Sequence, residues 1–136
     1  SMLAASQAAP PPWINHSDLQ ERHGASISIP DTAARGITME QLCALSDFMA
    51  LAVEDHRIVD TNAESPTVGM RITWDLLTMY HVCAYFVLPL TQPSRCSYVE
   101  WTATTEQPPS WLVSHWWGTP FSYTIRMLRF HAETRY

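Results

Sequence analysis

The sequence predicts a mainly helical α+β domain, with three main helices and a strand–turn–helix (βα) unit near its C-terminus. Apolar residues recur at helical spacing over residues 39–55, and an almost entirely apolar stretch without a β-branched run covers 73–87. An aromatic-rich run at 111–117 is bounded by turn-forming residues and leads into a third helical pattern at 120–134. These three observations indicate a mixed fold in which helices supply most of the core.

The first helix is predicted by its start signal and by its apolar spacing. Thr38 and Gln41 have the spacing of a capping box, in which each side chain bonds the backbone N–H of the other residue. Leu42, Leu45 and Met49 then recur along one face. We expect an amphipathic helix whose apolar face packs on the core.

The second helix is predicted to lie in the centre of the fold. Thr73 is placed to cap it, and Pro89 and Pro93 are expected to end it because proline lacks a backbone N–H. A helix that is apolar on nearly all sides is normally buried. Its polar side chains form a single stripe, which consists of Asp75, Thr78, His81 and Tyr85.

The βα unit combines a predicted strand at 111–117 with the third helix. Thr119 is a suitable N-cap and Pro120 a suitable first helical residue. Residues 26–29 alternate like a weaker second strand. The three helices are expected to form one core that contains Leu42, Leu45, Met49, Leu77, Tyr80, Ile125 and Leu128.

The chain has the size of one domain. Residues 1–16 are predicted to be a flexible tail, because the first twelve lack charge and periodicity and end in three prolines. Residues 17–136 are predicted to be a single globular domain, with a short helix opening at the capping box of 17–20. This domain could be the N-terminal portion of a longer protein.

The composition narrows the classes of function. Of the 136 residues, 46% are hydrophobic, and the net charge of -5 has the wrong sign for a general nucleic-acid binder. All eight basic residues are Arg, which excludes Schiff-base chemistry, pyridoxal phosphate attachment and a P-loop lysine. No stretch reaches the about 20 apolar residues of a membrane span. We therefore expect no nucleic-acid partner and no membrane partner.

The three cysteines, Cys43, Cys83 and Cys96, are odd in number and contain no CxxC pair. The N-terminus lacks the features of a signal peptide. We therefore expect reduced thiols that bind no metal, in a cytoplasmic protein without a cofactor.

The turn between the predicted strand and the third helix is the candidate ligand site. Backbone N–H groups at the start of a helix can meet an anion, and Trp116 and Trp117 could stack on a flat ligand such as a nucleotide base. The alternative is that both Trp side chains pack under neighbouring helices. No catalytic residue is assigned, because Ser114 and His115 would point to opposite faces of a strand. The candidate ligand-binding residues are Ser114, His115, Trp116, Trp117, Gly118 and Thr119.

Two resemblances extend these inferences. The run Cys96-Ser97-Tyr98-Val99-Glu100 and the block Ser114-His115-Trp116-Trp117-Gly118 resemble a segment of large uncharacterised proteins of algae and other protists. The resemblance covers roughly residues 73–133 and implies that this chain corresponds to an N-terminal portion of such a protein. The βα unit at 111–134 is similar to the opening unit of TIR-like domains, which implies a nucleotide-handling or self-association surface. No residue here matches the catalytic glutamate of NAD-cleaving TIR domains.

Three functions remain open from the sequence. The first is an intracellular protein-interaction or self-association module with a TIR-like βα unit. The second is a hydrolase or nucleotide-cleaving enzyme with its pocket at the Trp116–Thr119 turn and a small nucleotide-like ligand. The third is a structural N-terminal fragment of a larger protein. For the first, we expect a homo-oligomer or a partner protein. In a homodimer the strand 111–117 would pair antiparallel with its copy, whereas a monomer would leave 111–117 irregular or in a local hairpin.

Overall fold

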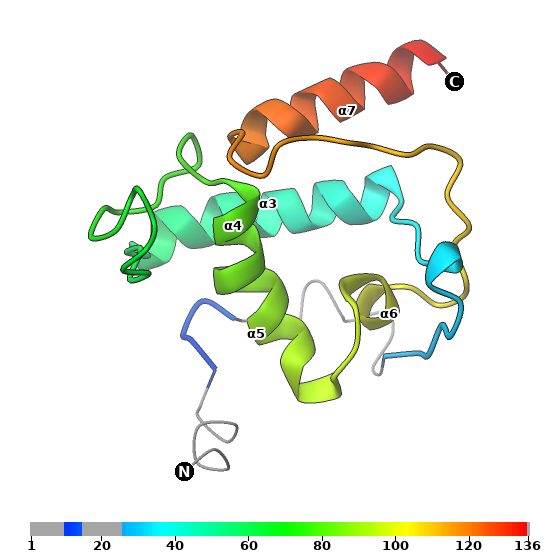
Figure 1. The fold of residues 1–136 in the computed structure, drawn as a ribbon, viewed down its shortest axis with the longest axis horizontal. Helices are drawn as coiled ribbons and strands as arrows, with labels where there is room; N and C mark the ends of the chain where they lie inside the picture. The colour runs from blue at the N-terminus through cyan, green and yellow to red at the C-terminus, as the bar shows by residue number, and fades with distance from the viewer. Residues whose placement is uncertain (1–9, 15–25, 136) are drawn as a thin grey trace.

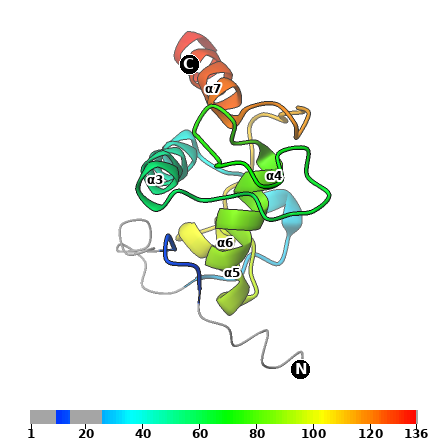
Figure 2. The same ribbon diagram turned by 90° about the vertical axis from the view of Figure 1, so that its left-hand side faces the viewer.

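The computed structural model describes residues 10–14 and 26–135, and this part of the chain is built from helices and irregular segments (Figure 1). The two long helices, α3 and α7, lie side by side and run in opposite directions (Figure 1). A third helical segment, formed by α4, η2 and α5, runs downward in the view of Figure 1 and leads toward the short helix α6 (Figures 1 and 2). In chain order the elements are η1 (Thr32–Ala34), α3 (Met39–His56), α4 (Met79–Val82), η2 (Cys83–Val87), α5 (Leu88–Thr91), η3 (Gln92–Ser94), α6 (Tyr98–Thr102) and α7 (Phe121–Arg135).

The predicted α+β class is wrong, because the described ranges contain no β-strand. Residues 111–117 are irregular and exposed, and no second strand of the described chain lies beside them. A strand needs a neighbour to pair its backbone groups, whereas an exposed segment can leave them to water. The strand–turn–helix unit is therefore a loop followed by a helix. Among the described residues, extended pairing is limited to three isolated bridges: Arg35 with Gln107, Val59 with Arg71, and Thr78 with Pro120.

The second predicted strand, residues 26–29, is instead held by the short helix α6. The backbone N–H of Ile27 donates to the Glu100 carbonyl at 3.0 Å, and the N–H of Ile29 donates to the Glu100 carboxylate at 2.8 Å. The Arg35 guanidinium lies 3.4 Å from the same carboxylate. The Ile29 and Ser97 N–H groups, more than the ion pair with Arg35, hold the pKa of Glu100 below its ordinary value.

The prediction of α3 is confirmed with nearly the same bounds. Thr38 and Gln41 form the capping box, with both hydrogen bonds at 3.0 Å. The helix ends at His56, where Arg57 adopts a left-handed conformation with φ of 50°. A residue in this conformation is a common helix terminator.

The N-cap of the central helix lies five residues later than predicted. Thr78, not Thr73, is the N-cap, and its backbone N–H donates to His81 Nδ1 at 3.0 Å. The chain just before it is used elsewhere, because the Leu77 carbonyl accepts from the Phe121 N–H at 2.7 Å. The Met79 N–H donates to the Trp117 carbonyl at 3.1 Å. These two bonds fix the start of α7 against the start of α4.

Pro89 lies inside the central helix rather than at its end. Because its nitrogen carries no hydrogen, the Tyr85 carbonyl one turn earlier loses a helical donor. The helix widens into the π-helical segment η2, in which the Leu88 N–H donates to the Cys83 carbonyl. The Trp13 indole Nε1 donates to the Tyr85 carbonyl at 2.7 Å and supplies the missing bond. The prediction that Pro89 ends the helix is therefore wrong, whereas α5 does end at Thr91, two residues before Pro93.

Helix α6 was not predicted, although the sequence contains its start signal. The Ser97 side chain accepts from the Glu100 N–H, and the Glu100 carboxylate accepts from the Ser97 N–H, which together form a capping box. The helix is only five residues long and all of them are buried. A single turn carries too little periodicity to be recognised by its apolar spacing.

One core joins the long helices, as predicted. Of the expected core residues, Leu45, Met49, Leu77 and Ile125 are buried, and Leu42 and Leu128 are half-buried. Tyr80 was predicted wrongly, since it is 58% exposed. The main buried cluster consists of Leu45, Met49, Ala52, Val53, Ile58, Ile72, Leu77, Val82, Phe86, Leu90, Tyr98, Trp101, Phe121 and Ile125.

Two predictions fall mainly outside the described residues. The short helix opening at 17–20 lies in the range 15–25, and the predicted tail 1–16 is described only at residues 10–14. In the described piece, Trp13 and Ile14 pack against the main core.

Replacing Leu45 by Ala should lower the free energy of unfolding by about 2–5 kcal/mol, because the truncation leaves a cavity in the main core. Chemical denaturation monitored by circular dichroism measures the difference. Leu51→Ala makes the same change on the same helix at a side chain that is 64% exposed, and it should be nearly neutral. Equal stability of the two variants would contradict the placement of Leu45.

Candidate functional site

The most connected polar group in the described chain is the carboxylate of Asp60, which is 1% exposed. Tyr85 donates its hydroxyl to Asp60 Oδ1 at 2.9 Å, and the Asn62 backbone N–H donates to the same oxygen at 3.0 Å. The hydroxyls of Ser65 and Thr67 donate to Oδ2 at 2.5 and 2.7 Å. A buried charge with this many donors is stabilised in its ionised form.

His81 connects this carboxylate to the start of the central helix. Its Nε2 lies 3.2 Å from Asp60 Oδ2 and 3.0 Å from the Thr67 hydroxyl. Its Nδ1 accepts from the Thr78 backbone N–H, which can only donate. The neutral ring therefore carries its proton on Nε2, directed toward Asp60.

The group contains serine, histidine and aspartate but cannot act as a catalytic triad. In a triad the histidine lies between the carboxylate and the nucleophile and takes the nucleophile's proton on a free nitrogen. Here Ser65 and His81 both bond the same oxygen of Asp60, and Nδ1 of the ring is already bonded to backbone. Asp60 and His81 are also buried, and Ser65 is half-buried, so the cluster holds the loop 60–67 on the central helix instead of acting on a substrate.

The electrostatics of Asp60 follow from these contacts. Burial alone would raise the pKa of its carboxyl, but the hydrogen bonds from Ser65 and Thr67, with those from Asn62 and Tyr85, outweigh burial. They hold the pKa of Asp60 well below its ordinary value. The carboxylate therefore stabilises the fold at neutral pH.

Sequence reasoning found one half of this cluster and missed the other. Thr78, His81 and Tyr85 were identified as the polar stripe of an otherwise apolar helix, which is a signal for a buried polar group. Asp60 lies in the irregular segment after α3, and no pattern in the sequence singled it out. Its position against the stripe depends on how the chain folds back, which no local pattern records.

The predicted ligand residues at 114–119 do not form an enclosed site. Ser114 and His115 are exposed, and His115 Nδ1 lies 3.2 Å from the Trp116 carbonyl. Trp116 is 73% exposed, and Trp117 is 43% exposed with its ring edge-to-face to Tyr80 at 5.5 Å. Neither Trp is packed beneath a helix. Ligand binding at this segment stays a prediction.

In the turn at 116–119, the indole ring of Trp116 lies directly against Gly118. A Cβ at Gly118 would collide with the indole ring of Trp116, so this position requires glycine in the present conformation. The Thr119 N–H donates to the Trp116 carbonyl at 3.1 Å, and the Phe121 N–H donates to Leu77. Two of the N–H groups that were predicted to meet an anion are therefore already bonded within the chain.

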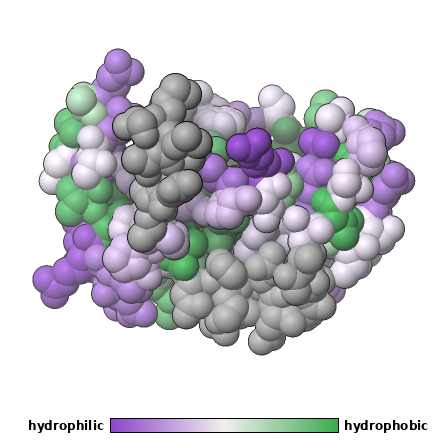
Figure 3. Space-filling model, turned by 90° about the horizontal axis from the view of Figure 1, so that it is seen from below, coloured by the Kyte–Doolittle hydropathy of each residue, from purple (hydrophilic) through white to green (hydrophobic). Residues whose placement is uncertain are grey.

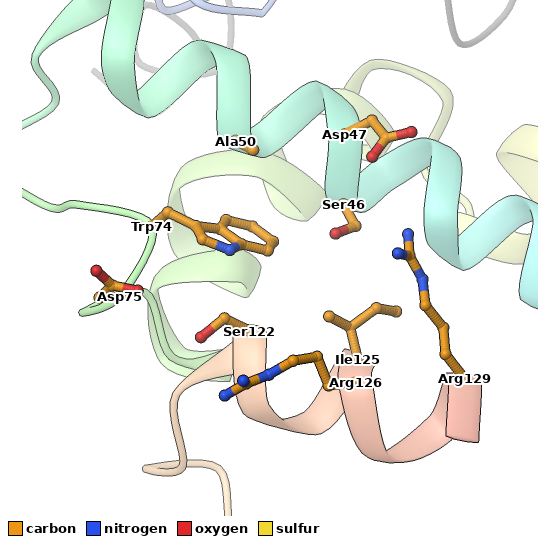
Figure 4. A pocket seen from close by; sticks show the side chains of 9 residues that line it. All are labelled: Ser46, Asp47, Ala50, Trp74, Asp75, Ser122, Ile125, Arg126 and Arg129. Atoms are coloured by element: carbon orange, nitrogen blue, oxygen red, sulfur yellow. The ribbon is translucent and has the colours of Figure 1, made fainter. Parts of the chain in front are cut away.

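A surface pocket of about 420 Å³ lies between α3 and α7, away from the predicted turn (Figure 4). Figure 4 shows Arg129 reaching from α7 toward α3 beside Asp47, with the Trp74 ring along one wall. Asp75 and Arg126 complete two acidic and two basic side chains around the pocket. Because these charges balance, the pocket gives no strong attraction to a simple anion or cation.

An exposed apolar surface is formed by the outer face of α7 and by the neighbouring segment 111–117; we call it the α7 surface. Figure 1 shows this segment running alongside α7. Trp111 contacts His131 of α7 edge-to-face, with ring centroids 4.9 Å apart. Its large exposed apolar side chains are Trp111, Leu112, Val113, Trp116 and Trp117 of the segment and Tyr123, Met127 and Phe130 of α7.

The lower face of the molecule, which lies away from α7, gives a contrast (Figure 3). Among its coloured residues, hydrophobic side chains are interspersed with hydrophilic ones in Figure 3. Scattered exposed apolar residues are normal on a monomer, whereas a contiguous set indicates an interaction site. The α7 surface is the better candidate on this ground.

The described residues contain neither a metal-binding cluster nor a helix that could span a membrane. Cys43, Cys83 and Cys96 are half-buried and form no disulfide. Across residues 10–14 and 26–135 there is no group of three or more His, Cys, Asp or Glu side chains that could hold a metal ion. Within the same ranges, each helix is too short or too polar to cross a lipid bilayer.

Comparisons of the chain with protein-family models, with curated proteins and with solved structures find no match. The resemblances proposed from the sequence therefore stay predictions.

Asp60→Asn should lower the free energy of unfolding at neutral pH by about 2 kcal/mol or more, because hydrogen bonds to a charged group are worth about 1.5–3 kcal/mol each. The pKa of Asp60 is lowered on folding from about 3.9 in the unfolded chain. Its contribution is thus complete above about pH 5 and is lost as the pH falls below that value. Urea unfolding at a series of pH values should show that the free energy of unfolding falls less steeply with decreasing pH in the variant than in the unchanged chain.

Asp55→Asn is the matched control for this experiment, since it removes the same charge from an exposed carboxylate at the end of α3. Its stability should follow that of the unchanged chain as the pH falls. If Asp60→Asn loses stability in acid as steeply as the unchanged chain, the role assigned to Asp60 is wrong.

Proposed function

We propose that this chain is a protein-interaction module that works by association through the α7 surface. The observation that supports the proposal is the exposure of large apolar and aromatic side chains along one helix and along the segment that runs beside it. Aromatic residues and Met are enriched at protein interfaces because they bury a large area per side chain.

The construction of α7 supports this role. Phe121 and Ile125 face the core and are buried, whereas Tyr123, Met127 and Phe130 on the other side are 52%, 57% and 69% exposed. A surface helix that only covers a core usually carries polar residues on its outer face. An outer face with three large apolar side chains is better explained by a partner that covers them.

The segment 111–117 supports the same role. Leu112 is 98% exposed, although leucine gains about 1.5–3 kcal/mol from full burial. The segment is fixed at both ends, by the contact of Trp111 with His131 and by the bond between the Trp117 carbonyl and the Met79 N–H. Its apolar side chains are thus presented from a defined backbone, which lowers the entropy lost on binding.

The enzymatic alternative has less support. The serine, histidine and aspartate of the buried cluster have the wrong connectivity for nucleophilic catalysis. The pocket between α3 and α7 has compensated charges, and the predicted turn is exposed. We further propose a cytoplasmic location, which the three unpaired thiols favour because reducing compartments keep cysteines unpaired.

A photoreactive benzoylphenylalanine in place of Phe130 should give a covalent adduct with one defined protein in the cells that make the chain. The reason is that Phe130 lies in the centre of the exposed face of α7. Mass spectrometry of the adduct identifies the protein, which is either a second copy or another chain.

The matched control places the same group at Leu51, which is exposed on α3 outside the α7 surface. It should give no adduct. The same adducts at both positions, or none at position 130, would contradict the proposed function.

A further inference from the structure

The exposed face of α7 has the spacing of a helix-pairing seam. Tyr123, Met127, Phe130 and Thr134 follow one another at intervals of four, three and four residues. This alternation places all four on one side of a helix and is typical of the seam of a coiled coil. All four are exposed. The helix therefore presents a second, outer seam in addition to its core-facing side.

One flank of this seam carries opposite charges at its two ends. Arg126 and Glu133 are both exposed, and they lie seven residues, or about two turns, apart. They therefore lie on the same side of the seam. Each of them directly precedes a seam residue, Met127 in one case and Thr134 in the other.

The relative direction of two such helices decides which charges meet. In an antiparallel pair each flank faces the same flank of the other helix, so Arg126 of one chain lies near Glu133 of the other. In a parallel pair that flank faces the opposite one, and Arg126 would lie near His131 instead. Flanking charges set partner choice and orientation in helix pairs. The charges on α7 are thus complementary to α7 itself in the antiparallel orientation.

We infer that α7 pairs antiparallel with α7 of a second copy about a two-fold axis. In this pair Met127 packs beside Phe130 of the other copy, and Arg126 forms an ion pair with Glu133 at both ends. The inference rests on the proposed function and names its partner. The two-fold symmetry makes the interface isologous, so each favourable contact occurs twice.

The segment beside α7 supplies area that the helix alone lacks. A helix of 15 residues is about 22 Å long, and a stable interface buries about 800 Å² on each partner. Trp111 lies along the other flank, since it contacts His131, and the next residue, Leu112, is almost fully exposed. Together the helix and the segment form a wider surface than one seam.

Sedimentation of the purified chain over a concentration series tests the pairing. The unchanged chain should dimerise. R126E and E133R should each raise the dissociation constant by about tenfold or more, because each places like charges together at both ends of the pair. The double variant R126E/E133R should restore dimerisation, and an equimolar mixture of the two single variants should form a heterodimer.

Arg135→Glu is the control, because it reverses a charge on the same helix outside the seam and its charged flank. It should leave the dissociation constant unchanged, and circular dichroism checks that every variant keeps its helical content.

The outcomes separate this inference from the proposed function. A chain that is monomeric at every concentration overturns the pairing, and so do single charge variants that dimerise like the unchanged chain. If Phe130→Ser abolishes association while the charge variants do not alter it, the chain associates through the α7 surface in another geometry. If position 130 crosslinks only to a different protein, the proposed function stands and the antiparallel pair is wrong.

Discussion

The buried carboxylate of Asp60 is the constraint on which the arrangement of the fold depends. It fixes the loop 60–67 to the central helix through the hydroxyl of Tyr85 and the imidazole of His81. His81 in turn bonds the Thr78 N–H and sets where the helix begins. Because the helix begins only after Thr78, the Leu77 carbonyl can accept from the Phe121 N–H at the start of α7. One ionised group thereby links a loop, the central helix and the placement of the C-terminal helix.

This dependence explains which predictions from sequence succeed. Helix α3 is correct to within one or two residues, because a capping box and a long apolar face are both local signals. The start of the central helix is displaced from Thr73 to Thr78, because the backbone there bonds residues 117–121, which are distant in sequence. Local patterns correctly predict a helix whose start signal and apolar face both lie within its own sequence. Hydrogen bonds to distant residues decide where the other helices begin and end.

The error at 111–117 has a related cause. Aromatic and apolar residues between turn formers satisfy the composition of a strand, but a strand also needs a neighbour. The segment that could have supplied one, 26–29, is bonded to α6. The same aromatic residues remain exposed beside α7, so composition indicated an unusual segment correctly while the type of structure was wrong. Among the candidate residues 114–119, Trp116 and Trp117 were not selected for exposure, which is the property that connects these two to the proposed function.

The bond from Trp13 to the Tyr85 carbonyl links two sites that are 72 residues apart in the chain. Pro89 removes a donor from the central helix, and an indole from a different segment replaces it. A sequence in which position 89 regained an ordinary amide could close that turn of helix by itself, and Trp13 would lose its hydrogen-bonding role. In related chains positions 13 and 89 should therefore vary together: a proline at 89 should occur with a side-chain donor at 13, and an ordinary residue at 89 should remove the need for that donor.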